Sequence, residues 1–183
     1  YNDRLRKLRW VGISKDTWSR SEIASKYDWY YTVEEMGLKY HLSDIPAAIG
    51  MVQLRKLDAM NARRREIVSR YNEAFEELPW LEIPVEKEYA RSALHNYVLK
   101  VERRDDFMAY LSSKGVATSV HYFPNHLYDI YRPYRRELPV TDAVWKRIVT
   151  LPLFPDLTDS QVGEIIEAVR SFGRLLGAKR PQR

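Results

Sequence analysis

The sequence predicts an α/β protein of the α+β small-domain kind, in which helices cover a small sheet and a long helix enters it. Three observations lead to this fold class. An apolar repeat with helical spacing extends over residues 43–78, which exceeds the length of most globular helices. After Pro79 the pattern is strand, strand, helix, strand, loop, helix, strand, helix. Hydrophobic residues make up 45% and charged residues 30% of the 183-residue chain, a balance that excludes global disorder.

The first part of the chain has little periodicity. Residues 1–9 alternate charged residues with two leucines at helical spacing, which predicts the last turns of a helix. Residues 11–36 are rich in aromatic residues without regular spacing, so we expect an irregular packed loop with a short strand near 30–33. Gly37 then opens a turn.

The long helix has recognisable ends. Ser43 is a suitable N-cap, and Pro46 lies in the first turn, where its missing N–H costs little. Apolar residues recur every three or four positions as far as Leu78, and Pro79 ends the helix. The stripe holds only an alanine between residues 61 and 65, which predicts a bend or a bridge between two domains there.

The remaining elements follow from capping residues and periodicity. Asp105 or Asp106 can cap a helix that ends before Gly115, which suits a C′ position. Thr158 and Gln161 have the spacing of a capping box. We expect strands at 81–83, 95–101, 116–122 and 151–154, helices at 105–111, 141–149 and 158–172, a loop at 123–139, and a frayed tail from residue 173.

Charge and composition exclude several classes of function. Of the net charge of +5, residues 1–26 carry +4 and residues 174–183 carry +4, so the middle of the chain is acidic. A nucleic-acid-binding domain gathers charge on one folded face, so this distribution argues against that class. No apolar run approaches the ~18 residues of a membrane span. The absence of cysteine excludes a disulfide, a thiolate nucleophile and a cysteine zinc site. Because the chain begins with Tyr1 and shows no signal segment, we expect a piece of a longer protein.

Few residues suggest chemistry by themselves. His41 lies beside Lys39 just before the long helix, where either an anion site or a solvated turn is consistent with the pattern. His121 and His126 share a loop, and polar loop residues or substrate contacts are favoured over a metal site. The three arginines at 63–65 are interpreted as a solvated helix surface.

The loop 122–134 is rich in tyrosine and arginine. Such a loop can stack nucleic-acid bases, bind a sugar nucleotide or contact a partner subunit. No nucleotide-binding glycine motif, hydrolase elbow or zinc-protease motif is present. The residues alone therefore predict an α/β piece that binds an anion.

Six strings together resemble a known family over most of the chain, from about residue 5 to about residue 172. The strings are LRWVGISKDTW (8–18), YDWYYTV (27–33), GLKYHLSDIPAAIGMVQLRKLD (37–58), ARRREIVSRY (62–71), SVHYFPNHLY (119–128) and LPLFPDLTD (151–159). Their order and spacing resemble the C-terminal half of the DegT/DnrJ/StrS family. These are cytoplasmic sugar aminotransferases with the aspartate aminotransferase fold (fold type I), and they depend on pyridoxal phosphate (PLP).

The resemblance implies a domain organisation and a homodimer. Residues 1–42 would form the trailing edge of the large PLP-binding domain, and 43–78 the long linking helix. Residues 79–173 would form the small C-terminal α/β domain, followed by a basic flexible tail at 174–183. The active sites would lie at the interface of a homodimer or, for this chain, beside the complementary N-terminal fragment.

The resemblance also implies binding residues. Lys39, Tyr40 and His41 match the turn that reaches the phosphate of the partner subunit's PLP. Many family members have Asn at the position of Lys39 or of His41, and neither is Asn here. The loop of Ser14 and Lys15 and the loop of His121 and Tyr122 match segments near the sugar substrate. The implied partners are a keto-sugar nucleotide and an amino-acid donor, with no metal, nucleic acid or membrane.

The family's Schiff-base lysine has no match in this chain. None of the ten lysines lies in its motif, and we expect that lysine upstream. Because transamination requires it, the parent protein is expected to be an aminotransferase and this chain alone to be inactive. A non-catalytic binding or regulatory relative is the alternative, and a nucleic-acid module is a further one.

Overall fold

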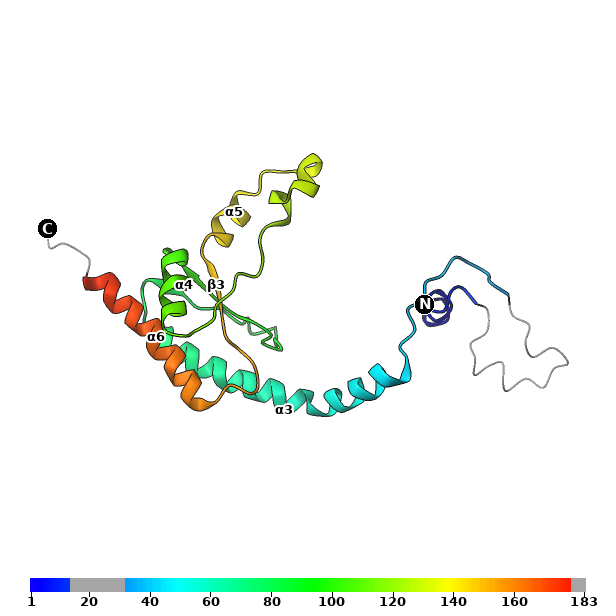
Figure 1. Cartoon of the computed structure of the whole chain (residues 1–183), viewed down its shortest axis with the longest axis horizontal. Helices are drawn as coiled ribbons and strands as arrows, with labels where there is room; N and C mark the ends of the chain where they lie inside the picture. Colours follow the sequence, from blue (N-terminus) through cyan, green and yellow to red (C-terminus); the bar gives the residue numbers. More distant parts are fainter. Residues whose placement is uncertain (14–31, 179–183) are drawn as a thin grey trace. The chain divides into compact units, whose positions relative to one another are not determined.

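The computed structural model describes residues 1–13 and 32–178 (Figure 1). The chain divides into two compact units, Tyr1–Arg55 and Lys56–Arg183, and the boundary falls inside the long helix α3 (Asp44–Phe75). The division at residues 42, 78 and 173 that the resemblance implies stays a prediction.

The described residues of the first unit form α1 (Asn2–Leu8), the first part of α3 and irregular segments between them. α1 confirms the helix predicted at residues 1–9. Two isolated antiparallel bridges follow, Trp10 with Lys39 and Ile13 with Val33. The predicted strand near residues 30–33 lies mostly outside the described residues.

The second unit contains the sheet, and its α/β character confirms the predicted fold class. The strands β1 (Leu81–Glu82), β2 (Tyr97–Val101) and β3 (Ile148–Leu151) lie in that order and are antiparallel. Leu99 pairs with Val149 at the centre of the β2–β3 ladder. Alternate residues of β2 are buried, as the period-two geometry of a strand requires.

Three helices cover the inward face of the sheet. α4 (Arg104–Ser113) packs against β2, β3 and α6 (Asp159–Ala178), and the C-terminal half of α3 completes the core (Figure 1). The core side chains are Ile67, Val68, Tyr71 and Phe75 of α3, Leu81, Tyr97, Leu99, Val101, Val149 and Leu151 of the sheet, Phe107 and Leu111 of α4, Val162, Ile165, Ala168, Val169 and Phe172 of α6, with Val116 and Leu157.

The sequence predicts a bend or a bridge between two domains at residues 61–65. α3 continues unbroken through them, so no break separates its two halves, and the expectation stays a prediction. The gap in the apolar stripe is occupied by arginines that bind other elements. Arg63 donates to the carbonyl oxygen of Leu157 at 2.7 Å, and Arg65 pairs with Glu86 at 3.2 Å. The interpretation as a solvated surface is therefore wrong for Arg63 and Arg65.

Asp159 is the acceptor that joins α6 to α3. Its Oδ1 accepts from Arg63 and from Arg70, each at 2.8 Å. The hydrogen bond and positive charge of Arg63, reinforced by Arg70, hold the pKa of this carboxyl below its usual range.

Between residues 116 and 149 one predicted element is wrong and another is correct only in part. Residues 116–122 form no strand, because the amide of Val116 bonds back to Leu111 of α4 and only Ser119 pairs with β3. The predicted helix 141–149 is divided. α5 (Pro139–Trp145) ends where the Arg147 amide bonds to Val144, and the β-branched residues that follow form β3.

The ends of the helices confirm some capping predictions. The Thr158 amide donates to Gln161 Oε1 at 3.0 Å, and the Gln161 amide donates to Thr158 Oγ1 at 3.2 Å, which confirms the capping box. Gly115 has a φ of +77°, as a C′ position requires. Neither Asp105 nor Asp106 caps α4, since both lie inside its first turn.

Two other segments complete the second unit. The predicted loop 123–139 contains the short 3₁₀ helices η1 (Asn125–Leu127) and η2 (Asp129–Tyr134). The prediction of a frayed tail is wrong for residues 174–178, which complete α6, and 179–183 lie outside the described residues. No helix of the described part is long and apolar enough to cross a membrane.

Candidate functional site

The first group of predicted site residues lies in the turn 37–41, which we call the Lys39 turn. Its backbone is fastened to the segment after α1. The Leu38 amide donates to the Leu8 carbonyl at 2.7 Å, and the Tyr40 amide donates to the Arg9 carbonyl at 2.8 Å. These hydrogen bonds fix the backbone of the turn, and with it the positions from which its side chains extend.

Two glycines allow this close approach. A Cβ atom on Gly37 would lie 2.2 Å from the backbone nitrogen of Gly12, and Gly12 has a φ of +76°. A side chain at either position would push the two segments apart.

Trp10 is the centre of the cluster that the turn forms. The Lys39 Nζ lies 3.7 Å from the Trp10 ring centroid, and the His41 ring stands edge-on to the indole with centroids 4.3 Å apart. Trp10 Nε1 and His41 Nδ1 are buried and have no hydrogen-bond partner among the described residues. Tyr40, by contrast, is 74% exposed.

This cluster fits an anionic group such as a phosphate. It combines an ammonium group with two ring nitrogens that have no hydrogen-bond partner within residues 1–13 and 32–178. α3 begins just after it, and a helix N-terminus favours negative charge, although Asp44 in the first turn offsets part of that effect. Ser14 and Lys15, predicted near the same site, lie outside the described residues.

The second group of predicted site residues, His121 and Tyr122, belongs to the other unit. His121 Nδ1 lies 2.8 Å from Thr150 Oγ1, which ties the ring to β3. Tyr122 is 71% exposed and borders a mainly apolar pocket of about 310 Å³. The rest of its lining is Pro124, Val140, Thr141, Val144, Trp145 and Ile148.

His126, the other histidine of this loop, has a structural role. Its Nε2 lies 2.9 Å from Asp142 Oδ1, and its side chain is only 10% exposed. The bond joins η1 to α5. Within the described residues, no group of three or more histidine, aspartate or glutamate side chains is arranged to hold a metal ion.

The sequence alone did not single out Trp10 or Thr150. Trp10 stands two residues before a glycine, a position without any helical or strand period. Thr150 is a polar residue inside the apolar run 148–151, and this interruption was the available signal. Both act through residues distant in the sequence, so local patterns do not show their roles.

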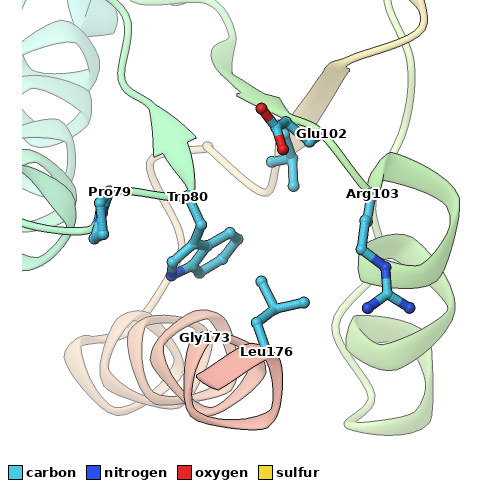
Figure 2. Close-up of a pocket in the computed structure, with 7 residues that line it drawn as sticks. Pro79, Trp80, Glu102, Arg103, Gly173 and Leu176 are labelled. Atoms are coloured by element: carbon cyan, nitrogen blue, oxygen red, sulfur yellow. The ribbon is translucent and has the colours of Figure 1, made fainter. Parts of the chain in front are cut away.

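A larger pocket, of about 400 Å³, lies elsewhere in the second unit and holds none of the predicted site residues. Figure 2 shows the Trp80 indole and Leu176 on one side of it and Glu102 and Arg103 on the other. A Cβ atom on Gly173 would lie 2.4 Å from Trp80 Nε1. The indole therefore packs directly on the backbone of α6.

This packing predicts opposite effects for two substitutions in α6. Gly173→Ala is expected to lower the free energy of unfolding by about 1–2 kcal/mol, because the rings of Phe107 and Phe172 hold Trp80 in place. Gly163→Ala is the matched control. A Cβ there meets open space, and its better helix propensity should stabilise the chain by about 0.5–1 kcal/mol. Urea denaturation of both variants tests this, and equal stabilisation by both would contradict it.

Comparison with known proteins identifies the family. Residues 1–170 match the DegT/DnrJ/EryC1/StrS aminotransferase family. The chain belongs to this family. The expected resemblance is thereby confirmed, and the predicted fold class is too, since the similar solved structures are fold type I aminotransferases matched over their C-terminal part.

Three relatives illustrate the similarity. The spore coat polysaccharide biosynthesis protein SpsC of Bacillus subtilis is 37% identical over 181 residues, which cover 93% of this chain and 46% of SpsC. The aminotransferase TlmJ of Streptoalloteichus hindustanus has a TM-score of 0.81 at 30% identity, covering 94% of this chain and 44% of TlmJ. The sugar aminotransferase CalS13 of Micromonospora echinospora has a TM-score of 0.82 at 30% identity, and the match covers 92% of this chain and 44% of CalS13. The chain thus spans less than half the length of these relatives.

Proposed function

We propose that this chain is the C-terminal part of a PLP-dependent aminotransferase. The protein would transfer an amino group from glutamate or a similar donor to a keto-sugar nucleotide, in cell-surface polysaccharide or antibiotic sugar biosynthesis in the cytoplasm. The family match over residues 1–170 carries the proposal. The names of SpsC and CalS13 support a sugar substrate.

The residues of this chain would bind and orient the cofactor and the sugar nucleotide. Lys39, Tyr40 and His41 would hold the phosphate of the partner subunit's PLP. The Lys39 ammonium group supports this assignment, as do the ring nitrogens of His41 and Trp10, which have no hydrogen-bond partner among the described residues. His121 and Tyr122, with Ser14 and Lys15, would contact the sugar nucleotide. PLP, when bound, supplies an electron sink for the bonds at the donor's α-carbon.

A homodimer interface is proposed for the N-terminal half of α3. Apolar side chains there are exposed, whereas the buried residues of α3 all belong to its C-terminal half. An exposed apolar patch of this kind is typical of an interaction surface. The exposed side chains are Ile45, Ile49, Met51, Val52, Leu54 and Leu57.

The proposal is tested by assaying three samples with PLP, glutamate and a keto-sugar nucleotide. The intact gene product should transaminate, and this chain alone should not, because none of its lysines lies in the family's Schiff-base motif. Mixing the chain with its complementary N-terminal fragment should restore activity. Transamination by the chain alone would refute its proposed inactivity. An intact protein that binds the sugar nucleotide but no PLP would favour a non-catalytic relative.

A further inference from the structure

Thr150 is a polar residue in a buried position. It is only 6% exposed and is the one buried polar residue of the described part of the chain. Its neighbours in β3, Val149 and Leu151, belong to the core, so the alternation of the strand directs Thr150 to the opposite face. A hydroxyl group in such a place is unfavourable unless it makes a hydrogen bond.

The backbone brings His121 to this hydroxyl. Ser119 and Thr150 exchange two backbone hydrogen bonds, of 3.2 and 2.8 Å, in an isolated antiparallel bridge. His121 lies two residues beyond Ser119, within the diagonal reach of a side chain opposite Ser119. Thr150 thus holds the loop segment twice, through its backbone and through the bond to His121 Nδ1.

The direction of that bond follows from hydrogen-bond accounting. Among the described residues, the Thr150 hydroxyl has no acceptor other than His121 Nδ1. If Nδ1 carried a proton and donated it, the hydroxyl proton would be buried without an acceptor. The hydroxyl therefore donates to Nδ1, and the neutral imidazole carries its own proton on Nε2.

We propose that Thr150 is a positioning residue that fixes His121 as the Nε2–H tautomer. His121 then presents a hydrogen-bond donor, not a base, to a ligand. The ligand atom that meets the Nε2–H must be a hydrogen-bond acceptor, such as a hydroxyl or phosphate oxygen of the sugar nucleotide. The choice of the sugar nucleotide alone rests on the proposed function. Tyr122, whose ring stands edge-on to His121 at 4.9 Å, limits the ring from another side.

The test is ¹⁵N NMR of the histidine rings in the 183-residue chain, at a pH well above the ordinary histidine pKa of about 6.5. We expect the Nε2–H tautomer of His121 in the wild type and in Thr150→Ser, and a mixture of both tautomers in Thr150→Val. Thr118→Val is the matched control, because Thr118 is half-buried in the same segment. The His126 signal, set by Asp142, is an internal reference that should not change.

An Nδ1–H tautomer of His121 in the wild type, or an unchanged tautomer in Thr150→Val, would overturn the proposal. In the intact enzyme, Thr150→Val should raise KM for the sugar nucleotide about 3- to 10-fold, and Thr150→Ser should restore it. A KM that does not change would overturn the ligand step. An intact protein without transaminase activity would refute the proposed function but leave the tautomer result standing.

Discussion

Phe107→Ala is expected to lower the free energy of unfolding of the second unit by about 3–5 kcal/mol. Phe107 is completely buried. Its ring centroid lies 5.6 Å from that of Trp80 and 5.2 Å from that of Phe172. Truncation would leave a cavity bounded by two rigid rings, which cannot collapse into it. Because a domain of this size is stable by only about 5–15 kcal/mol, the loss is a large share of the total.

Urea denaturation followed by far-UV circular dichroism measures this loss. Phe154→Ala is the matched control, since Phe154 is 46% exposed and should cost less than about 1 kcal/mol. If both variants lost the same stability, the aromatic cluster around Phe107 would not be the centre of the core.

The core residues of a helix were predictable from the sequence where the helix buries only one face, because its apolar residues then repeat with helical spacing. α6 has a single buried face, so the predicted stripe marked both the helix and its inward side. The stripe consists of Val162, Ile165, Ile166, Val169 and Phe172. The capping box was also predictable, because its two residues, Thr158 and Gln161, are only three positions apart in the sequence.

The errors arose where distant contacts replaced local ones. Arg63 and Arg65 interrupt the apolar stripe of α3, yet they are bound by groups far along the sequence, Asp159 and Glu86. Similarly, Val149 fits a helical stripe, but its pairing with Leu99 places it in a strand. A single-sequence period cannot show which partner an element will meet.

The site was predictable only in part, because a resemblance transfers positions and not their surroundings. It pointed to Lys39 and His41, and the structure brings both onto one indole, that of Trp10. It pointed to His121, and the structure adds Thr150. Whether these residues bind PLP and sugar nucleotide stays a proposal.

Lys39→Ala in the intact protein is expected to weaken PLP binding about 10- to 100-fold, the range for losing a hydrogen bond to a charged group. The reason is electrostatic, since Lys39 is the only cationic side chain stacked on Trp10 among the described residues. Lys39→Arg should retain most of the affinity, since it keeps the charge.

PLP binding is measured by dialysis against graded concentrations of inorganic phosphate, with absorbance reporting the retained cofactor. Lys114→Ala is the matched control, because Lys114 also lies over an aromatic ring, that of Tyr110 at 5.6 Å, but not in the Lys39 turn. Phosphate should displace PLP from Lys39→Ala at lower concentrations than from the wild type or from Lys114→Ala.

Trp10→Phe separates the two contributions of the indole. Phenylalanine keeps an aromatic face under Lys39 but lacks the Nε1–H, which has no partner in the part of the chain that the structure describes. A loss of PLP affinity as large as that of Lys39→Ala would indicate that Nε1 itself meets the phosphate. A small loss would indicate that Trp10 acts by holding the ammonium group in place. Unchanged affinity in Lys39→Ala would contradict the assignment of this turn to phosphate, and the unpaired nitrogens would then require a different ligand.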